Sequence, residues 1–139
     1  MSSINTIISE IKAEGHRLTK VRLAMLKILA KTKLPLNSAT ISTKLNALNV
    51  GANRTTVYRE LVFLVENNII KKIQFSDHKM YYEVCADHHH HLICNKCHKI
   101  QEIVLGEHLE RQEKQIYKQK NFQVISHSLE FYGLCQNCR

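Results

Sequence analysis

The sequence has no apolar run approaching the roughly 18 residues that a membrane-spanning helix requires. Its first residues, MSSINTIISEIKAEGH, also lack the basic start and the continuous apolar stretch of a secretion signal. We therefore expect no membrane segment and no signal peptide, and we place the protein in the cytoplasm. Because disulfides are rare in that reducing compartment, paired cysteines there are more often metal ligands.

Sequence signatures of common enzyme sites are missing as well. No phosphate-binding glycine loop, nucleophilic triad or H-E-x-x-H zinc motif can be recognised. One partial match remains, because HLE at 108–110 followed by Cys135-x-x-Cys138 resembles the pattern of zinc deaminases. However, Leu134 stands where that pattern has proline, and the two cysteines have better partners elsewhere. A zinc hydrolase or deaminase is thus a remote alternative.

The charge of the chain is unevenly distributed. The 139 residues are 44% hydrophobic, enough to form a core in one ordinary domain or two small ones. Residues 1–84 hold 13 Lys and Arg against 6 Asp and Glu, a net of +7, whereas residues 85–139 hold 7 against 6. This asymmetry indicates a polyanion as the partner of the first part, with nucleic acid the first candidate.

Helical periodicity runs through the first part of the chain, where four amphipathic helices are predicted. The first ends at Gly15, and Thr19, Ser38 and Asn53 can cap the other three. The single proline, Pro35, separates the second helix from the third. The residues expected to face inward are Ile4, Ile7, Ile8 and Ile11, then Val21, Ala24, Ile28 and Leu29, then Ile41, Leu45 and Leu48, and finally Val57, Leu61 and Leu64.

The segment after the fourth helix predicts a β-hairpin, because the β-rich runs IIKKIQF and MYYEV are joined by SDHK. Helices followed by such a hairpin are typical of a winged helix-turn-helix, whose last helix reads DNA. The outer face of that helix carries side chains suited to base edges and phosphates. They are Arg54, Thr55, Thr56, Tyr58 and Arg59. An ordinary solvated helix face is the alternative that this pattern leaves open.

Four cysteines form two Cys-x-x-Cys pairs, Cys94 with Cys97 and Cys135 with Cys138, with 37 residues between the pairs. Each pair can bind one metal ion, and two pairs complete a tetrahedral zinc site that is closed to water and hence structural. Two disulfides or idle thiols are the competing interpretation, which a reducing compartment disfavours. A zinc-stabilised scaffold for protein partners would explain these cysteines, but neither the predicted wing nor the charge asymmetry.

Four consecutive histidines lead into a predicted strand just before the first cysteine pair. Since successive side chains of a strand point to opposite faces, His89 and His91 face one way and His88 and His90 the other. One run of histidines could therefore serve two metal sites. It could also be a nonspecific metal scavenger.

Further ligands for such sites are available on both sides of the histidine run. They are Glu83, Cys85, Glu102, Glu110 and His127, the last expected on the final strand beside inward Leu129 and Phe131. Each has an ordinary explanation too: His127 could be a hydrogen-bonded core histidine, and Glu110 a solvated helix residue.

Taken together, these segments resemble the ferric uptake regulator family of metal-dependent transcriptional repressors. The resemblance rests on HRLTKVRLAMLKIL, TTVYRELVFLVENNII, HHHHLICNKCHKIQEI and HSLEFYGLCQNC. It implies an α+β chain, with a winged helix-turn-helix DNA-binding domain over 1–84 and a small α/β dimerisation domain with a four-cysteine zinc site over 85–139. It also implies a homodimer, or a tetramer on DNA, that binds double-stranded operator DNA and represses metal-homeostasis genes.

The resemblance also implies roles for individual residues. Cys94, Cys97, Cys135 and Cys138 match the family's structural zinc ligands. Tyr58 and Arg59 match its base-reading pair, and Arg17 matches a basic residue that reaches the minor groove. Glu83, His89 and His91 match the sensing site, while His88, His90, Glu110 and His127 match a second site in the dimerisation domain.

The metal that is sensed depends on Cys85, which competes with Glu83 for one coordination position. Iron- and peroxide-sensing members of the family draw a histidine from just before the third helix, where this chain has Leu34 and Leu36. Thiolate with imidazole suits zinc better than iron(II) or manganese. We therefore expect a regulatory zinc ion and a zinc uptake regulator, with an iron-, peroxide- or manganese-sensing regulator as the alternative. A Cys85 that is only a small buried hydrophobe is the competing interpretation.

Overall fold

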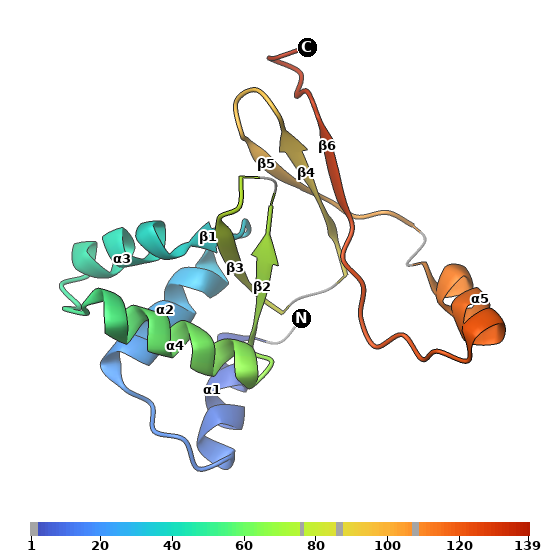
Figure 1. The fold of residues 1–139 in the computed structure, drawn as a ribbon. Helices are drawn as coiled ribbons and strands as arrows, with labels where there is room; N and C mark the ends of the chain where they lie inside the picture. The colour runs from blue at the N-terminus through green and yellow to red at the C-terminus, as the bar shows by residue number, and fades with distance from the viewer. Residues whose placement is uncertain (1–2, 76, 86–87, 107–108) are drawn as a thin grey trace. The chain divides into compact units, whose positions relative to one another are not determined.

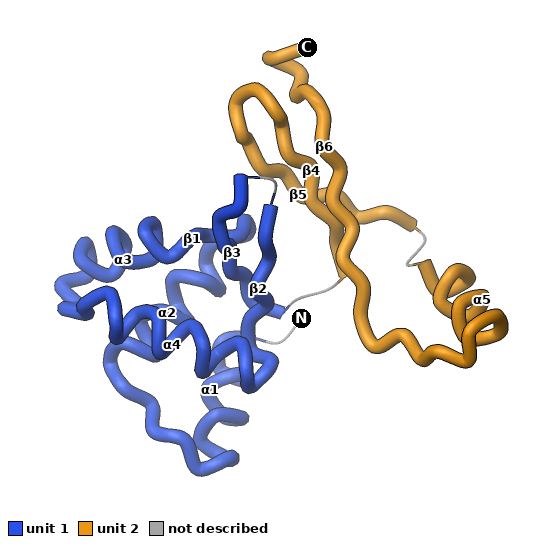
Figure 2. The backbone as a smooth tube through the Cα atoms, in the orientation of Figure 1, with its two compact units in different colours: residues 1–86 blue, residues 87–139 orange. Residues whose placement is uncertain are grey.

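The computed structural model describes residues 3–75, 77–85, 88–106 and 109–139 (Figure 1). The chain divides into two compact units, Met1–Ala86 and Asp87–Arg139 (Figure 2). The boundary expected after residue 84 falls just before this division. Within the described ranges, every helix is too short or too polar to cross a membrane.

Unit 1 packs three of its four helices against a small sheet, and its first helix packs against the second (Figure 1). Its elements are α1 (Ile4–Ala13), α2 (Lys20–Lys31), β1 (Leu36–Asn37), α3 (Ser38–Ala47), α4 (Arg54–Glu66), β2 (Ile70–Gln74) and β3 (Met80–Val84). Most of the predicted inward residues form its core: Ile7, Ile11, Ala24, Ile28, Leu29, Ile41, Leu45, Val57, Leu61 and Leu64 are buried. Leu48 is a wrong prediction, since it is 55% exposed at the C-cap of α3.

The helix starts follow the local capping chemistry. Thr19 and Asn53 are the predicted N-caps, and their side chains accept hydrogen bonds from the backbone N–H groups of Arg22 and Thr56. The third helix corrects the prediction, because its cap is Asn37 and not Ser38. The Asn37 backbone is extended, and its Oδ1 accepts from the N–H of Thr40 at 2.8 Å.

The sheet of unit 1 has the strand order β1-β3-β2 with antiparallel pairing. The predicted hairpin is confirmed as β2 and β3, whose residues pair from Ile70 with Val84 to Gln74 with Met80. The predicted linker SDHK is described except for Ser76, which lies outside the described residues. The short strand β1, which the sequence did not predict, adds a third strand through Leu36 opposite Tyr82. Helices with this sheet form the winged helix-turn-helix that was predicted.

Unit 2 is built around β4 (His90–Cys94), the central strand of a second sheet with the order β5-β4-β6. The strand β5 (Ile100–Ile103) pairs with β4 antiparallel, whereas β6 (Glu130–Gly133) pairs with it parallel. A parallel neighbour requires a long crossover connection, and α5 (Glu110–Lys120) lies in that connection.

Two predictions about the end of unit 2 were wrong. His127 does not lie on the last strand, because β6 begins only at Glu130 and His127 belongs to the irregular segment before it. Phe131 does not face inward in this chain, since 43% of its surface is exposed. None of the residues of α5 is buried either.

Candidate metal centres and DNA-reading helix

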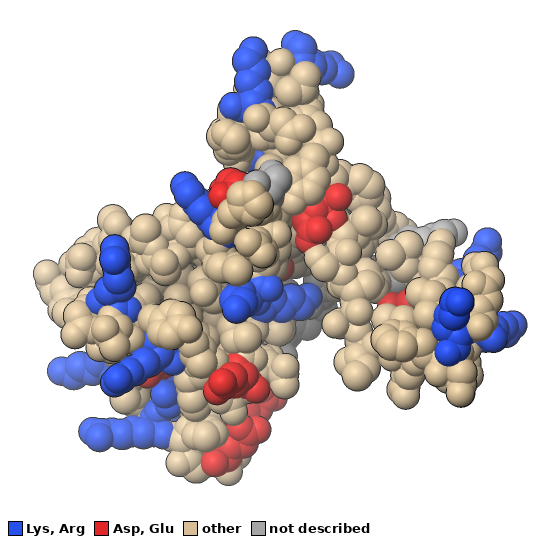
Figure 3. Space-filling view, viewed as in Figure 1, with Lys and Arg blue, Asp and Glu red and all other residues tan. Residues whose placement is uncertain are grey.

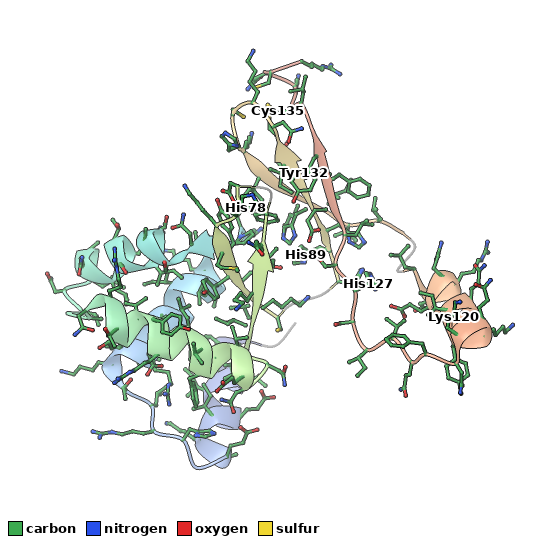
Figure 4. All side chains as sticks on the ribbon, viewed as in Figure 1. His78, His89, Lys120, His127, Tyr132 and Cys135 are labelled. Carbon is green, nitrogen blue, oxygen red and sulfur yellow. The ribbon has the colours of Figure 1, made fainter. Side chains whose placement is uncertain are left out.

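The four predicted zinc ligands meet at one end of unit 2. The sulfur atoms of Cys94, Cys97, Cys135 and Cys138 all lie within 4.8 Å of one another. Figure 4 shows Cys135 at the end of the unit where the β4–β5 turn and the chain after β6 come together. The Sγ atoms of Cys97 and Cys135 are 3.7 Å apart. Sulfurs about 2.3 Å from a tetrahedral zinc ion stand about 3.8 Å apart, so this geometry fits a metal centre.

Backbone geometry prepares Cys94 as a thiolate. The N–H groups of Cys97 and Cys135 point at its Sγ, at 3.5 and 3.4 Å. These donors hold the pKa of the Cys94 thiol at about 5, well below its ordinary value. The pKa of Cys138 is raised to about 12, chiefly because its thiol is hydrogen-bonded to the Cys135 side chain. Binding a metal ion here therefore releases the proton of the Cys138 thiol.

The histidine run separates into the two ring pairs that strand alternation predicts. The rings of His88 and His90 are 4.7 Å apart in an edge-to-face contact, and those of His89 and His91 are 4.9 Å apart in another. His127 joins the first pair, and the ligand nitrogens of His88, His90 and His127 lie within 4.8 Å of one another. Figure 4 shows His127 on the segment that leads into β6.

The distance between two of these imidazoles suits a shared ion. Nε2 of His127 lies 3.2 Å from Nε2 of His88. Two imidazole nitrogens bound to one tetrahedral ion at about 2.0–2.1 Å stand about 3.3 Å apart. Three histidines from two segments of unit 2 thus form a second candidate metal centre.

Glu113, which the sequence analysis did not single out, contacts this histidine cluster. Its Oε1 lies 2.8 Å from Nδ1 of His127. A carboxylate can only accept, so Nδ1 carries the proton and Nε2 keeps its lone pair on the side of His88. Glu110, the residue predicted as a ligand, opens α5 and is not in the cluster formed by the described residues. The spacing of Glu110 and Glu113 along one helix is a signal that could have suggested both.

The remaining predicted ligands occupy defined places in their own units. Glu83, on β3 of unit 1, is only 6% exposed, which is uncommon for a carboxylate. Cys85 follows β3, and its backbone N–H donates to the carbonyl of Ile69 at 3.1 Å. Burial is the main reason why the pKa of its thiol is raised. Glu102 is an exposed residue of β5 in unit 2.

The helix α4 presents the predicted DNA-reading side chains. Arg54, Thr55, Tyr58 and Arg59 are exposed, Tyr58 by 63%, and Thr56 is half-buried. Arg17 is exposed in the connection between α1 and α2. Figure 3 shows Lys and Arg side chains projecting from the helical part of unit 1.

A hollow beside α4 adds two residues that the sequence analysis missed. It has a volume of ≈ 790 Å³ and is lined by Arg54, Thr55 and Tyr58 on one side. Ser38 and Ser42, from the first turns of α3, line the other side. Hydroxyl groups one turn apart at a helix start are suited to phosphate oxygens, and that spacing was visible in the sequence.

This arrangement speaks against the deaminase alternative, because the two cysteines that its motif needs, Cys135 and Cys138, are grouped with Cys94 and Cys97. The histidine of its HLE motif, His108, lies outside the described residues.

Comparisons with known proteins agree with this architecture. Residues 13–132 match the Ferric uptake regulator family. The ferric uptake regulation protein of Bordetella parapertussis is 34% identical over 133 residues, covering 94% of this chain and 95% of that protein. The structure of the Helicobacter pylori ferric uptake regulator, described as having three functional metal-binding sites, has a TM-score of 0.81 at 26% identity, covering 98% of this chain and 93% of that one.

A third match is a ferric uptake regulator from Francisella tularensis, whose structure contains iron. It has a TM-score of 0.74 at 32% identity and covers 89% of this chain and 95% of that one. The matched residues take in both units, from the end of α1 to β6. This chain therefore belongs to the ferric uptake regulator family, whose members are metal-responsive transcription regulators.

Proposed function

We propose that this protein is a zinc-responsive repressor of metal-homeostasis genes that binds operator DNA as a homodimer. Regulation of transcription in response to a metal follows from the family. The choice of zinc is carried by one observation, the thiol of Cys85 beside the buried carboxylate of Glu83 at the end of β3. Thiolate and imidazole donors together favour zinc over iron(II) and manganese.

The proposed sensing site takes Glu83 and Cys85 from unit 1 and His89 and His91 from unit 2. The segment that leads into α3 supports zinc, because Thr32–Asn37 contains no histidine and offers leucines instead. When bound, a divalent ion supplies the positive charge that holds these donors together. Ligation by residues of both units favours the arrangement that fits DNA, with a coupling of about 1–3 kcal/mol.

Zinc is expected to switch on DNA binding at sub-micromolar free concentration, whereas iron(II) and manganese require higher levels. Cys85→Ser should blunt this response, because an alcohol is a much poorer zinc ligand than a thiolate, and should leave the four-cysteine centre loaded. The measurement is an anaerobic titration of DNA binding with metal-buffered zinc, iron(II) and manganese side by side, using duplexes selected from a randomised pool.

Iron sensing is the second candidate, since the Bordetella parapertussis relative is named for ferric uptake and the Francisella tularensis structure contains iron. Activation by iron(II) at free levels where zinc is ineffective, together with an unchanged response of Cys85→Ser, would select this candidate and reject zinc.

The homodimer is supported by large apolar side chains that unit 2 leaves exposed. Exposed apolar surface of this extent is typical of protein interfaces. These residues are Val104, Ile116, Tyr117, Phe122, Ile125, Phe131, Tyr132 and Leu134. With none of its residues buried, α5 is the element expected to gain most from a second copy of the chain.

We assign a structural zinc ion to the four cysteines and a second divalent ion to His88, His90 and His127. At the second centre, Glu113 keeps Nδ1 of His127 protonated and so orients Nε2 toward the ion. The resemblance instead assigns Glu110 to this centre as a direct ligand. The roles of Glu110 and Glu113, both on α5, can therefore be tested separately by replacing each in turn.

Glu113→Gln is expected to weaken zinc binding at the second centre about 10- to 100-fold, as removal of a carboxylate behind a metal-bound histidine usually does. Glu110→Gln is the matched control, because it makes the same change in the same helix. The measurement is competition with a zinc chelator on protein that retains its four-cysteine zinc. A large loss for Glu110→Gln with none for Glu113→Gln would show that Glu110 is the ligand and that Glu113 has no role.

A further inference from the structure

A largely buried ion pair joins α2 to the DNA-reading helix α4. The Nε of Arg22 lies 2.9 Å from one carboxylate oxygen of Glu60, and its Nη2 lies 3.2 Å from the other. The two side chains are only 12% and 14% exposed. Two parallel hydrogen bonds between a planar guanidinium and a carboxylate fix orientation as well as distance.

The same guanidinium also holds the connection between α1 and α2. Its Nη1 donates to the backbone carbonyl of Arg17 at 2.6 Å. One side chain thus contacts the segment that carries Arg17 and the helix that carries Tyr58 and Arg59. These are two of the places from which DNA contacts are expected.

An aromatic ring completes the arrangement from the α4 side. The Cζ of Arg22 lies 3.6 Å from the ring centroid of Phe63, a cation–π contact. The ring of His16, next to Arg17, meets Phe63 edge-to-face at 4.9 Å. Glu60 and Phe63 are three residues apart and therefore share one flank of α4. Arg22, His16 and Phe63 all lie in the described part of unit 1.

The position of Glu60 decides how the contact acts on DNA reading. Glu60 directly follows Arg59, while Val57 and Leu61 face the core on the adjacent side of α4. The apolar contacts of Val57 and Leu61 are non-directional, whereas the two-point bond from Arg22 fixes the orientation of α4 as well as its distance. Rotation of α4 about its axis would carry Arg59 and Tyr58 away from their base partners.

We propose that Arg22 is a positioning residue for sequence recognition, which sets the rotation of α4 through Glu60 and holds Arg17 in register with it. The inference rests on the proposed function insofar as α4 and Arg17 contact DNA. Arg22 itself makes no base contact in this role. Its loss therefore affects the preference for one sequence over another more than the affinity for DNA in general.

The test compares Arg22→Gln with Lys27→Gln, which removes the same charge from an exposed position of the same helix. Affinities are measured for a duplex selected by the wild-type protein from a randomised pool and for a shuffled duplex. Arg22→Gln should lower the ratio of the two affinities by roughly tenfold, comparable to the loss of one good base contact. Lys27→Gln should leave the ratio unchanged.

Arg22→Lys is a second variant that separates the proposed role from a general loss of folding, because lysine keeps the positive charge but cannot form the two-point bond. It should keep the wild-type thermal unfolding midpoint within a few degrees and still lower the ratio. In both Arg22 variants, hydrogen exchange should become faster in peptides covering 14–19 and 54–60. A wild-type ratio in the two Arg22 variants would overturn the role of Arg22.

If the proposed function were wrong, the result would differ from a failure of the Arg22 proposal, because the wild-type protein itself would select no sequence from the pool. Hydrogen exchange then decides the inference alone, and unchanged exchange in 14–19 and 54–60 upon Arg22→Lys would reject it.

Discussion

Replacement of Cys94 by serine is expected to abolish the folding of unit 2 and, with it, dimerisation. Cys94 is the most buried of the four cysteines and receives both backbone N–H groups at its sulfur. Binding of structural zinc supplies folding free energy directly, of the order of 10 kcal/mol in small zinc domains. Unit 1 should stay folded, because its hydrophobic core is formed by its own residues.

Three measurements check this result on the purified protein. Zinc content should fall by one equivalent per chain, light scattering should report a monomer, and hydrogen exchange should lose protection only beyond residue 87. Cys85→Ser is the matched control, since it removes the fifth cysteine and should retain the four-cysteine zinc, the dimer and the protection. A Cys94→Ser variant that stays dimeric and unfolds like the wild-type protein would show that the four-cysteine centre is not structural.

Arg59→Ala is expected to remove most of the base preference at one position of each half-site. A bidentate contact of arginine with guanine contributes about 1–3 kcal/mol of discrimination, so preference there should fall about tenfold or more. Lys72→Ala, on the exposed wing strand β2, should instead weaken binding to all sequences and lower the salt dependence by about one counterion. Lys71 is a poorer control, because its charge lowers the pKa of Cys85.

The check is a binding series on the selected duplex, on single-base variants of it and on shuffled DNA at several salt concentrations. Equal losses on selected and shuffled DNA for Arg59→Ala would mean that Arg59 contacts only phosphate.

The features that could be predicted from the sequence are those that local backbone geometry determines. Thr19 and Asn53 cap helices because a short polar side chain reaches a nearby N–H, and neighbouring histidines separate because a strand alternates. The choice of Asn37 over Ser38 as a cap depended on the extended backbone of β1, whose pairing with β3 is not local.

Contacts between distant segments could not be predicted. The ion pair of Arg22 with Glu60 joins residues 38 positions apart, and no periodicity of the sequence indicates it. Glu113 was missed because the face of α5 that turns toward His127 is set by a contact with the irregular segment before β6, which has no periodic pattern in the sequence. Exposure of Leu48 and Phe131 was missed because apolar spacing predicts burial without knowing the neighbour that provides it.

The parallel pairing of β4 with β6 sets the order in which the chain can mature on the ribosome. Unit 1 consists largely of local helical contacts and can fold as soon as it has left the exit tunnel. The strand β4 has to wait, since its partner β6 and the last two thiols of the metal centre are made only after α5. A nascent chain can therefore possess a finished DNA-reading domain while still lacking the means to dimerise or to respond to metal.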